Sequence, residues 1–276
     1  MENSITKKNK VFFFEDFSTK ELNENKVGRK GLSLFNLKKM DVPVPEFFVV
    51  GSSVFTDFCL TALESNKQKL LEKGRNPEGD EIAKVLLEQE FTKDVQEEIL
   101  SAYTRLSGFS DAWVSVRSSV VFPANENVSF SGIFSTELNV RKYEDLKNAI
   151  KKVYASLFTD DVVAYANKMD IDLAEVKLAV VIQKMVQAEI SGVAFTVDPI
   201  TQDDTKLGIE AVYGFGDVIS AGEITPDSYL LNKRDLSIVE KHIAPQEWMK
   251  IRTMNPSHSR RSNEERIKIS SWWSHK

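Results

Sequence analysis

Val116-Arg117-Ser118-Ser119 is the stretch on which the interpretation of the fold depends. Residues 113–116 predict a strand, so Arg117 stands at a strand end, where a guanidinium can fork onto phosphate oxygens. The small residues of Ser129-Phe130-Ser131-Gly132, continuing to Thr136, predict a flexible loop whose backbone N–H groups close over an anion. Taken alone, an arginine before two serines is also typical of a capped turn with a surface charge.

A second candidate phosphate contact lies upstream, in Val27-Gly28-Arg29-Lys30-Gly31. Glycines let a backbone approach phosphate oxygens, and a lysine supplies a point charge to them. The same pattern is typical of an ordinary helix start with a solvated lysine. The apolar repeat of residues 32–40 predicts that helix, Pro43-Val44-Pro45 ends it, and residues 47–50 predict a strand.

Val181-Ile182-Gln183-Lys184-Met185-Val186 predicts a strand. Backbone N–H and C=O groups at its end can bind the polar edge of a small ligand, while Gln183 and Met185 can shape a pocket there. A plain β-hairpin with a methionine in the core is the alternative interpretation.

The order of the remaining segments predicts an α+β protein with mixed or antiparallel sheets. Helical patterns cover about 53–73, 79–106 and 143–158, and short strands separated by turns dominate from residue 178 to residue 239. The chain from about residue 254 is polar, which predicts a loop followed by a short helix.

Composition limits the function classes. The 276 residues are 42% hydrophobic with a net charge of -5, so the chain is expected to be globular and has no global charge that favours nucleic acid. Cys59 is the only cysteine, which fits a reducing, cytoplasmic setting and excludes a cysteine-based zinc cluster. The longest aliphatic run, residues 178–182, is far below the roughly 18 residues that span a bilayer, so no membrane is expected.

The common nucleotide-binding motifs are missing. No glycine-lysine pair exists, which excludes a P-loop. Gly214-Phe215-Gly216 fails as a dinucleotide fingerprint because Ile219 stands where the third glycine is needed. The H-R-D and D-F-G motifs of protein kinases are absent too.

Four segments together resemble the ATP-binding domain shared by phosphoenolpyruvate synthase, pyruvate phosphate dikinase and rifampin phosphotransferase, over about residues 20–240. The resemblance implies an ATP-grasp-like fold with two lobes, a domain over residues 1–250, and a tail over 251–276 that is expected to be a truncated family helix. The matching segments are Val27 to Gly31 with Pro43-Val44-Pro45, Val116 to Ser119 with Ser129 to Gly132 and Leu138-Asn139-Val140, Val181 to Val186 with Ser191-Gly192-Val193-Ala194-Phe195-Thr196 and Asp198-Pro199, and Glu210 to Asp217 with Thr225-Pro226-Asp227-Ser228-Tyr229.

The resemblance also implies roles for individual residues, with ATP held between the two lobes. Lys30 and Arg117 would neutralise phosphates during catalysis, and the loop would close over them. The backbone of residues 181–186 would read the edge of the adenine base, with Gln183 and Met185 lining its pocket. The ATP-binding residues expected from the resemblance are Lys30, Arg117, Ser131, Gly132, Thr136, Gln183, Met185, Val186, Glu210 and Asp217.

The chain departs from the family pattern in three places. Arg29 replaces a glycine, Glu126 alone stands where the family has an acidic pair, and Asp217 is shorter than the family glutamate. The hairpin that binds magnesium in the family is expected to lie beyond this chain, so ATP and Mg²⁺ are the expected cofactors but no metal ligand is assigned. A histidine-bearing domain and a pyruvate-binding domain are expected on other sequence.

Three functions remain open at this point. The first is the ATP-binding part of a phosphoenolpyruvate synthase-like dikinase, which converts ATP, pyruvate and water to phosphoenolpyruvate, AMP and phosphate through a phosphohistidine. The second is the same part of a rifampin-type antibiotic phosphotransferase. The third is a nucleotide-binding or interaction protein without catalysis, and neither the final acceptor nor the oligomeric state follows from the sequence.

Overall fold

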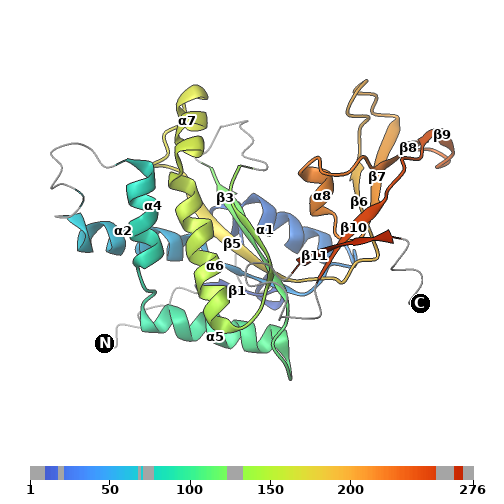
Figure 1. Cartoon of the computed structure of the whole chain (residues 1–276). Helices are drawn as coiled ribbons and strands as arrows, with labels where there is room; N and C mark the ends of the chain where they lie inside the picture. Colours follow the sequence, from blue (N-terminus) through green and yellow to red (C-terminus); the bar gives the residue numbers. More distant parts are fainter. Residues whose placement is uncertain are drawn as a thin grey trace. The chain divides into compact units, whose positions relative to one another are not determined.

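The computed structural model describes residues 10–17, 22–67, 70, 78–122, 133–252 and 264–269. The chain divides into two compact units, residues 1–185 (unit 1) and 186–276 (unit 2) (Figure 1). Unit 1 combines helices with an antiparallel sheet, and unit 2 is mostly β. The prediction of an α+β fold is therefore confirmed. Within the described ranges, no helix has the length and apolar character needed to cross a membrane.

The sheet of unit 1 is built around β5 (Lys177–Lys184), which is buried from residue 178 to residue 183. Its strands β2 and β3 pair with it on either side, and every neighbouring pair is antiparallel. The order across the sheet is β1 (Val11–Phe12), β2 (Phe47–Val50), β5, β3 (Val114–Val121) and β4 (Thr136–Val140).

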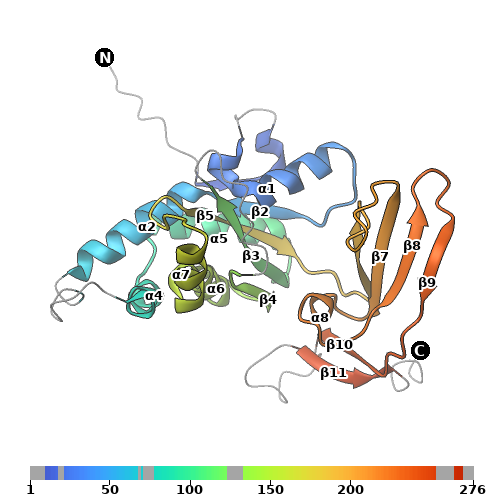
Figure 2. The same cartoon turned by 90° about the horizontal axis from the view of Figure 1, so that it is seen from above.

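Helices cover both faces of this sheet (Figure 2). On one face, α1 (Glu24–Lys39) buries Val27 and Phe35 against Phe47, Val49 and Val181. The larger core lies on the other face, because residues alternate across a strand and Phe48 and Val50 point the opposite way. The helices of that core are α2 (Ser52–Ser65), α4 (Gly79–Glu88), α5 (Lys93–Ser107), α6 (Tyr143–Ala155) and α7 (Asp160–Lys168), and the short 3-10 turns of unit 1 are η1 (Phe14–Phe17) and η2 (Ser156–Phe158).

The prediction of one helix over residues 79–106 is wrong. The backbone becomes extended at Gln89 and again at Thr92, so α4 and α5 are separate helices. Between them Phe91 is only 4% exposed and packs on Phe58 with ring centroids 4.5 Å apart. Burial of this ring in the core decides the break, and helical periodicity does not report such long-range packing.

Unit 2 contains an antiparallel four-stranded sheet in the order of the chain. Its strands are β6 (Ile190–Phe195), β7 (Lys206–Tyr213), β8 (Asp227–Asn232) and β9 (Ile238–His242). The short helix α8 (Asp217–Ser220) follows β7, and a two-stranded hairpin of β10 (Trp248–Arg252) and β11 (Glu264–Lys268) completes the described part of this unit.

The expectation of a helix in the tail is not met at residues 264–268, which form β11. Ile267 pairs with Met249 in the register of this hairpin, and Met249 is buried. The Arg266 guanidinium lies 4.5 Å from the ring centroid of Trp248 on the partner strand. Cross-strand pairing of this kind outweighs the weak local preference of so short a segment. The domain boundary at residue 250 stays a prediction, and β10 spans it.

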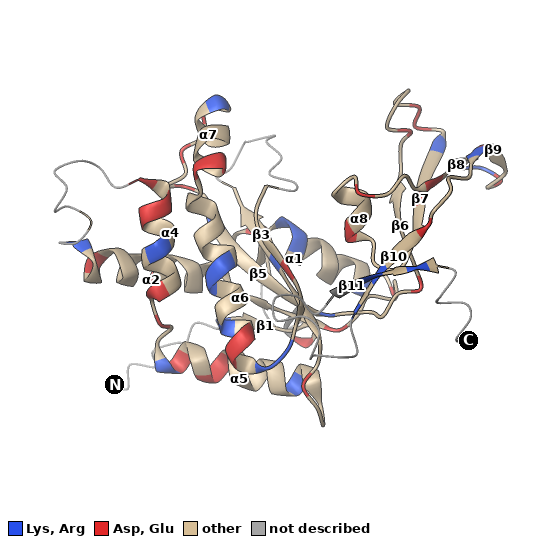
Figure 3. Ribbon diagram, viewed as in Figure 1, with Lys and Arg blue, Asp and Glu red and all other residues tan. Residues whose placement is uncertain are grey.

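Charged residues of both signs occur along the helices of unit 1 (Figure 3). On α5, for example, Asp94 pairs with Lys10, and Arg105 pairs with Glu15 at 3.0 Å. These two ion pairs join α5 to residues 10 and 15 near the start of the described chain.

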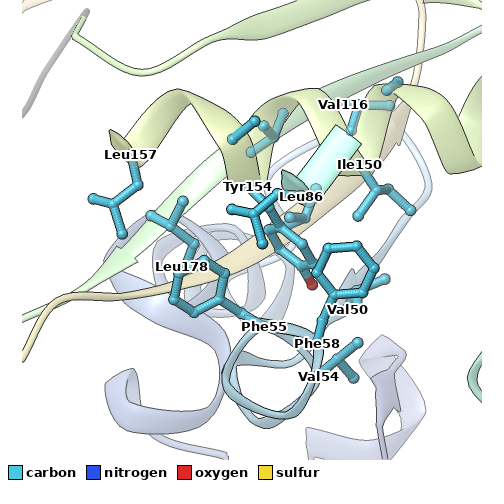
Figure 4. Close-up of a cluster of buried hydrophobic side chains, with 14 of the residues drawn as sticks. Val50, Val54, Phe55, Phe58, Leu86, Val116, Ile150, Tyr154, Leu157 and Leu178 are labelled. Carbon is cyan, nitrogen blue, oxygen red and sulfur yellow. The ribbon is translucent and has the colours of Figure 1, made fainter. Parts of the chain in front are cut away.

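Among the described residues, the largest side chain with no exposed surface is Tyr154, which sits among aromatic rings in the larger core of unit 1 (Figure 4). Its ring centroid lies 5.0 Å from that of Phe55, 5.6 Å from that of Phe58 and 6.2 Å from that of Phe91. Among the described residues its hydroxyl has no hydrogen-bond partner. Burial raises the pKa of this phenol well above its usual value. The core therefore contains a polar group that contributes only the cost of its desolvation.

Replacing Tyr154 by Phe is expected to raise the free energy of unfolding by about 1 kcal/mol, because a buried hydroxyl without a partner costs about 1–3 kcal/mol. Tyr103→Phe is the matched control, because the Tyr103 hydroxyl donates to the Ala112 carbonyl at 2.7 Å and accepts from the Lys142 amide at 3.0 Å. Urea denaturation should show the control destabilised by about 1 kcal/mol. Equal destabilisation of both variants would contradict this account of the core.

Candidate functional site

The N-terminal part of α1 turns sharply at Gly28, which has φ 70° and ψ 169° inside an otherwise helical segment. A side chain cannot be accommodated here. A Cβ on Gly28 would lie 2.3 Å from the carbonyl oxygen of Ser119 and 2.4 Å from its hydroxyl. Glycine is required both for the positive φ and for this close approach of α1 to β3.

The side chain of Ser119 joins the two sides of this turn. Its hydroxyl donates to the carbonyl of Val27 at 2.8 Å and accepts from the amide of Gly31 at 2.9 Å. Ser119 has no exposed surface, so water does not compete for either bond. The first helical turn after Gly28 is thereby fixed to the strand that carries Arg117.

Lys30 and Arg117 are brought close together by this arrangement. Burial, and after it the charge of Arg117, lowers the pKa of Lys30 from 10.5 to about 8. Burial also lowers the pKa of Arg117. In the part of the chain that the structure describes, neither side chain forms an ion pair or a hydrogen bond. Two partly buried cations without a counter-ion are typical of a site that binds an anion.

The backbone adds to this positive potential. The helix that restarts after Gly28 runs to Lys39, and its N-terminal end carries Lys30. The partial positive charge of a helix N-terminus favours an anion at the same place. The cation pair, defined as Lys30 and Arg117, together with this helix start forms the candidate phosphate-binding site of unit 1.

The replacement of a family glycine by Arg29 is accommodated without strain. Gly28 alone takes the positive φ, and Arg29 has helical backbone angles. The Arg29 side chain points to solvent, pairs with Glu24 at 3.2 Å and lies 5.3 Å from the ring centroid of Phe122. The departure at this position therefore leaves the turn intact.

The loop that is expected to close over the phosphates is only partly described. Ser131, Gly132 and Glu126 lie outside the described residues. Thr136 is described and exposed, and it is the first residue of β4, directly opposite Arg117 in the register of the sheet. Its position beside the cation pair is consistent with the predicted role, which stays a prediction.

Of the candidate adenine residues, Gln183 lies in β5, and Met185 and Val186 follow the strand. The Gln183 side-chain amide donates to the carbonyl of Pro45 at 3.3 Å, and Gln183 is buried. The amide of Met185 donates to the carbonyl of Trp113 at 2.9 Å, while Val186 is exposed. Gln183 therefore holds the segment before β2 in place, and only Met185 and Val186 present accessible surface.

Glu210 and Asp217 belong to unit 2. Glu210 lies in the middle of β7, opposite Ser228. Asp217 begins α8 and forms a salt bridge with Lys250 of β10. Glycine is required at position 214, which has φ 76° and lies close to β10. A Cβ there would lie 2.3 Å from the carbonyl oxygen of Lys250. Sequence reasoning did not identify Lys250, and no local signal in the sequence marks it.

A magnesium site is not evident in the described part of the chain. No group of three His, Cys, Asp or Glu side chains comes together there. Mg²⁺ prefers several oxygen ligands in octahedral geometry, and one Asp217 oxygen is already bound to Lys250. These residues do not fit a complete metal site, so no metal-dependent step is derived from them.

The chain is similar to known proteins along nearly its whole length. A family model described as the pyruvate phosphate dikinase, AMP/ATP-binding domain, matches residues 24–271. A probable phosphoenolpyruvate synthase of Methanocaldococcus jannaschii is 33% identical over 87% of the chain and 21% of its own length. A phosphoenolpyruvate synthase of Aeropyrum pernix is 35% identical over 79% of the chain and 28% of its length. An uncharacterized phosphotransferase of Bacillus subtilis is 32% identical over 84% of the chain and 26% of its own length.

These matches have two consequences. They confirm the family resemblance and, with it, the ATP-grasp-like character of the fold. The chain spans 21 to 28% of the length of these three relatives. Activities that need the remaining parts of such proteins are therefore matters for proposal.

Lys30→Met is expected to raise the free energy of unfolding at pH 7 by on the order of 2 kcal/mol, because it removes a charge that burial and Arg117 disfavour. Folded Lys30 releases its proton near pH 8, whereas the unfolded chain holds it until near pH 10.5. The stability of the wild type therefore rises with pH in this window, and the advantage of the variant shrinks. Urea denaturation at pH 7 and pH 10 measures the difference.

Arg117→Met serves as the control background for the comparison of unfolding free energies at pH 7 and pH 10. Removing Arg117 should reduce the pH-dependent difference without abolishing it, because burial is the larger cause of the lowered Lys30 pKa. An advantage of Lys30→Met that stays the same from pH 7 to pH 10 would contradict the description of the site.

Proposed function

The chain belongs to the pyruvate phosphate dikinase AMP/ATP-binding domain family, and on that premise we propose that unit 1 binds the phosphates of ATP through Lys30 and Arg117. The supporting observation is the pair of partly buried cations that have no counter-ion in the described part of the chain.

Electrostatics explains why a polyanion suits this place. Two like charges in a partly buried place repel each other more strongly than they would in bulk water. In the ligand-free protein this interaction is repulsive and destabilises the site. Phosphate oxygens would offset this repulsion, because the Arg117 guanidinium would donate forked hydrogen bonds to them while Lys30 acts as a point charge.

The base of the nucleotide is proposed to contact the end of β5. Met185 and Val186 present accessible surface there, so they are the candidates for packing against adenine. Gln183 is proposed to act indirectly, since its side-chain amide already donates to Pro45. Thr136 would complete the phosphate site from β4.

In a whole protein we propose that this domain supplies ATP to a phosphoenolpyruvate synthase reaction. ATP and water would yield AMP, phosphate and a phosphohistidine on a separate domain, and the phosphoryl group would pass from there to pyruvate. Two relatives bear the name phosphoenolpyruvate synthase, which favours pyruvate over an antibiotic as the acceptor. Charge neutralisation by cations is the contribution that such a transfer requires from this domain. The magnesium that such a transfer uses has no assigned ligands here.

Titration of ATP by calorimetry is the test of binding. The wild type should bind saturably, and Arg117→Ala should weaken binding at least about tenfold, because a charge-assisted hydrogen bond of about 1.5–3 kcal/mol is lost. Arg105→Ala is the matched control, since Arg105 lies on α5 and pairs with Glu15. Titrations with and without magnesium show whether the metal contributes.

The absence of ATP binding to folded wild type would contradict the proposed function. Equal weakening by Arg105→Ala would also count against it, because the effect would then come from general loss of positive charge. Inorganic tripolyphosphate as a competitor would show that the phosphates provide the recognised charge.

Glu210 and Asp217 are proposed to contribute to nucleotide binding from unit 2, and their substitutions should differ. Asp217→Asn is expected to lower the free energy of unfolding by about 1 kcal/mol or more, because the partly buried Lys250 would lose its charged partner. Glu210→Gln should leave stability unchanged and lower ATP affinity alone. If Glu210→Gln binds ATP as the wild type does, Glu210 is not part of the site.

A further inference from the structure

We propose that Ser119 is a positioning residue of the candidate site, which holds the start of the helix after Gly28 so that Lys30 stays beside Arg117. The inference rests on the proposed function in that the cation pair is taken as the phosphate site. It extends that function to a residue that contacts neither the expected ligand nor solvent.

The register of β3 supports this role. Side chains two residues apart in a strand point to the same face, so Arg117 and Ser119 both face α1. Arg117 supplies one charge on this face, and the Ser119 hydroxyl fixes the backbone that supplies the other. Its bond to Gly31 holds the residue directly after Lys30, at 2.9 Å. Its bond to Val27 holds the residue before the turn, at 2.8 Å.

The two hydrogen bonds of Ser119 also act against the repulsion between Lys30 and Arg117. Gly28 approaches the Ser119 backbone so closely that nothing larger than hydrogen fits between them. Mutual repulsion of Lys30 and Arg117 acts to separate α1 from β3 at this point. The two hydrogen bonds of Ser119 oppose that separation, since each ties α1 to β3 at one end of the turn. Without them the helix start can relax and carry Lys30 away from Arg117.

Ser118 provides a matched comparison within the same strand. It is nearly as buried as Ser119, at 6% exposed against 0%, but its side chain points to the opposite face of the sheet. Within the described ranges its hydroxyl makes no hydrogen bond. Ser118→Ala and Ser119→Ala thus remove the same atom from the same strand, and only the second releases the turn.

The experiment measures the titration of Lys30 in the full chain by NMR of ¹³C-labelled lysine, with its signal assigned through Lys30→Arg. The wild type and Ser118→Ala should titrate near pH 8. In Ser119→Ala the midpoint should move toward the ordinary lysine value near 10.5, because Lys30 leaves both its buried position and Arg117. The affinity for ATP should fall about fivefold to tenfold in the same variant, as expected for two lost hydrogen bonds.

An unchanged Lys30 midpoint in Ser119→Ala would overturn the proposal, because it would show that Lys30 keeps its position without the Ser119 hydroxyl. Any loss of stability in that variant would then come from packing alone. Failure of the wild type to bind ATP would refute the proposed function instead, and the comparison of midpoints would still decide the role of Ser119. If Ser119→Ala does not fold, Ser119→Cys replaces it. A thiol is a weaker donor and acceptor, so part of the upward shift is expected, and no shift would overturn the proposal.

Discussion

The hydroxyl of Ser119 is the contact on which the arrangement of unit 1 around its candidate site depends. It satisfies a carbonyl on one side of the Gly28 turn and an amide on the other, in a place without water. A backbone that leaves helical geometry at Gly28, in the N-terminal part of α1, needs such a partner for the N–H and C=O groups that lose their helical bonds. The turn then sets where Lys30 stands, and β3 sets where Arg117 stands. One buried side chain thus links the helix to the central sheet and the sheet to the site.

This arrangement is unfavourable for stability and favourable for binding. Two like charges are held in a partly buried position, and burial together with Arg117 lowers the Lys30 pKa to about 8. A fold selected only for stability would pair each cation with a carboxylate or leave it exposed. Lys10, Lys151, Lys152 and Lys184 of unit 1 are paired in this way. The unfavourable energy is concentrated where an anion would remove it, and a preorganised charge of this kind needs little rearrangement on binding. The membership of the chain in the AMP/ATP-binding domain family is the reason that ATP is proposed as that anion.

The sheet of unit 1 could be predicted from the sequence because its central strand β5 is continuously apolar. The run from residue 178 to residue 182 has no polar interruption and forms the centre of the sheet. The break at Phe91 could not be predicted, because it depends on a distant aromatic cluster. The strand β11 was missed because its pairing with β10 joins segments separated by a polar stretch.

Lys30 and Arg117 were identified from residue type and resemblance, and the lowered Lys30 pKa is consistent with that choice. The hydrogen bonds of the Ser119 hydroxyl could not be predicted from the sequence, because a bond between residues 88 positions apart leaves no local pattern.

The most direct test of the account is a crystal structure of the chain grown with a non-hydrolysable ATP analogue at neutral pH. The account predicts that terminal phosphate oxygens lie within hydrogen-bond distance of both the Lys30 ammonium and the Arg117 guanidinium. It also predicts that the Ser119 hydroxyl keeps its bonds to Val27 and Gly31 in that complex. A nucleotide whose phosphates contact neither cation, with Lys30 and Arg117 left without an anion, would contradict it.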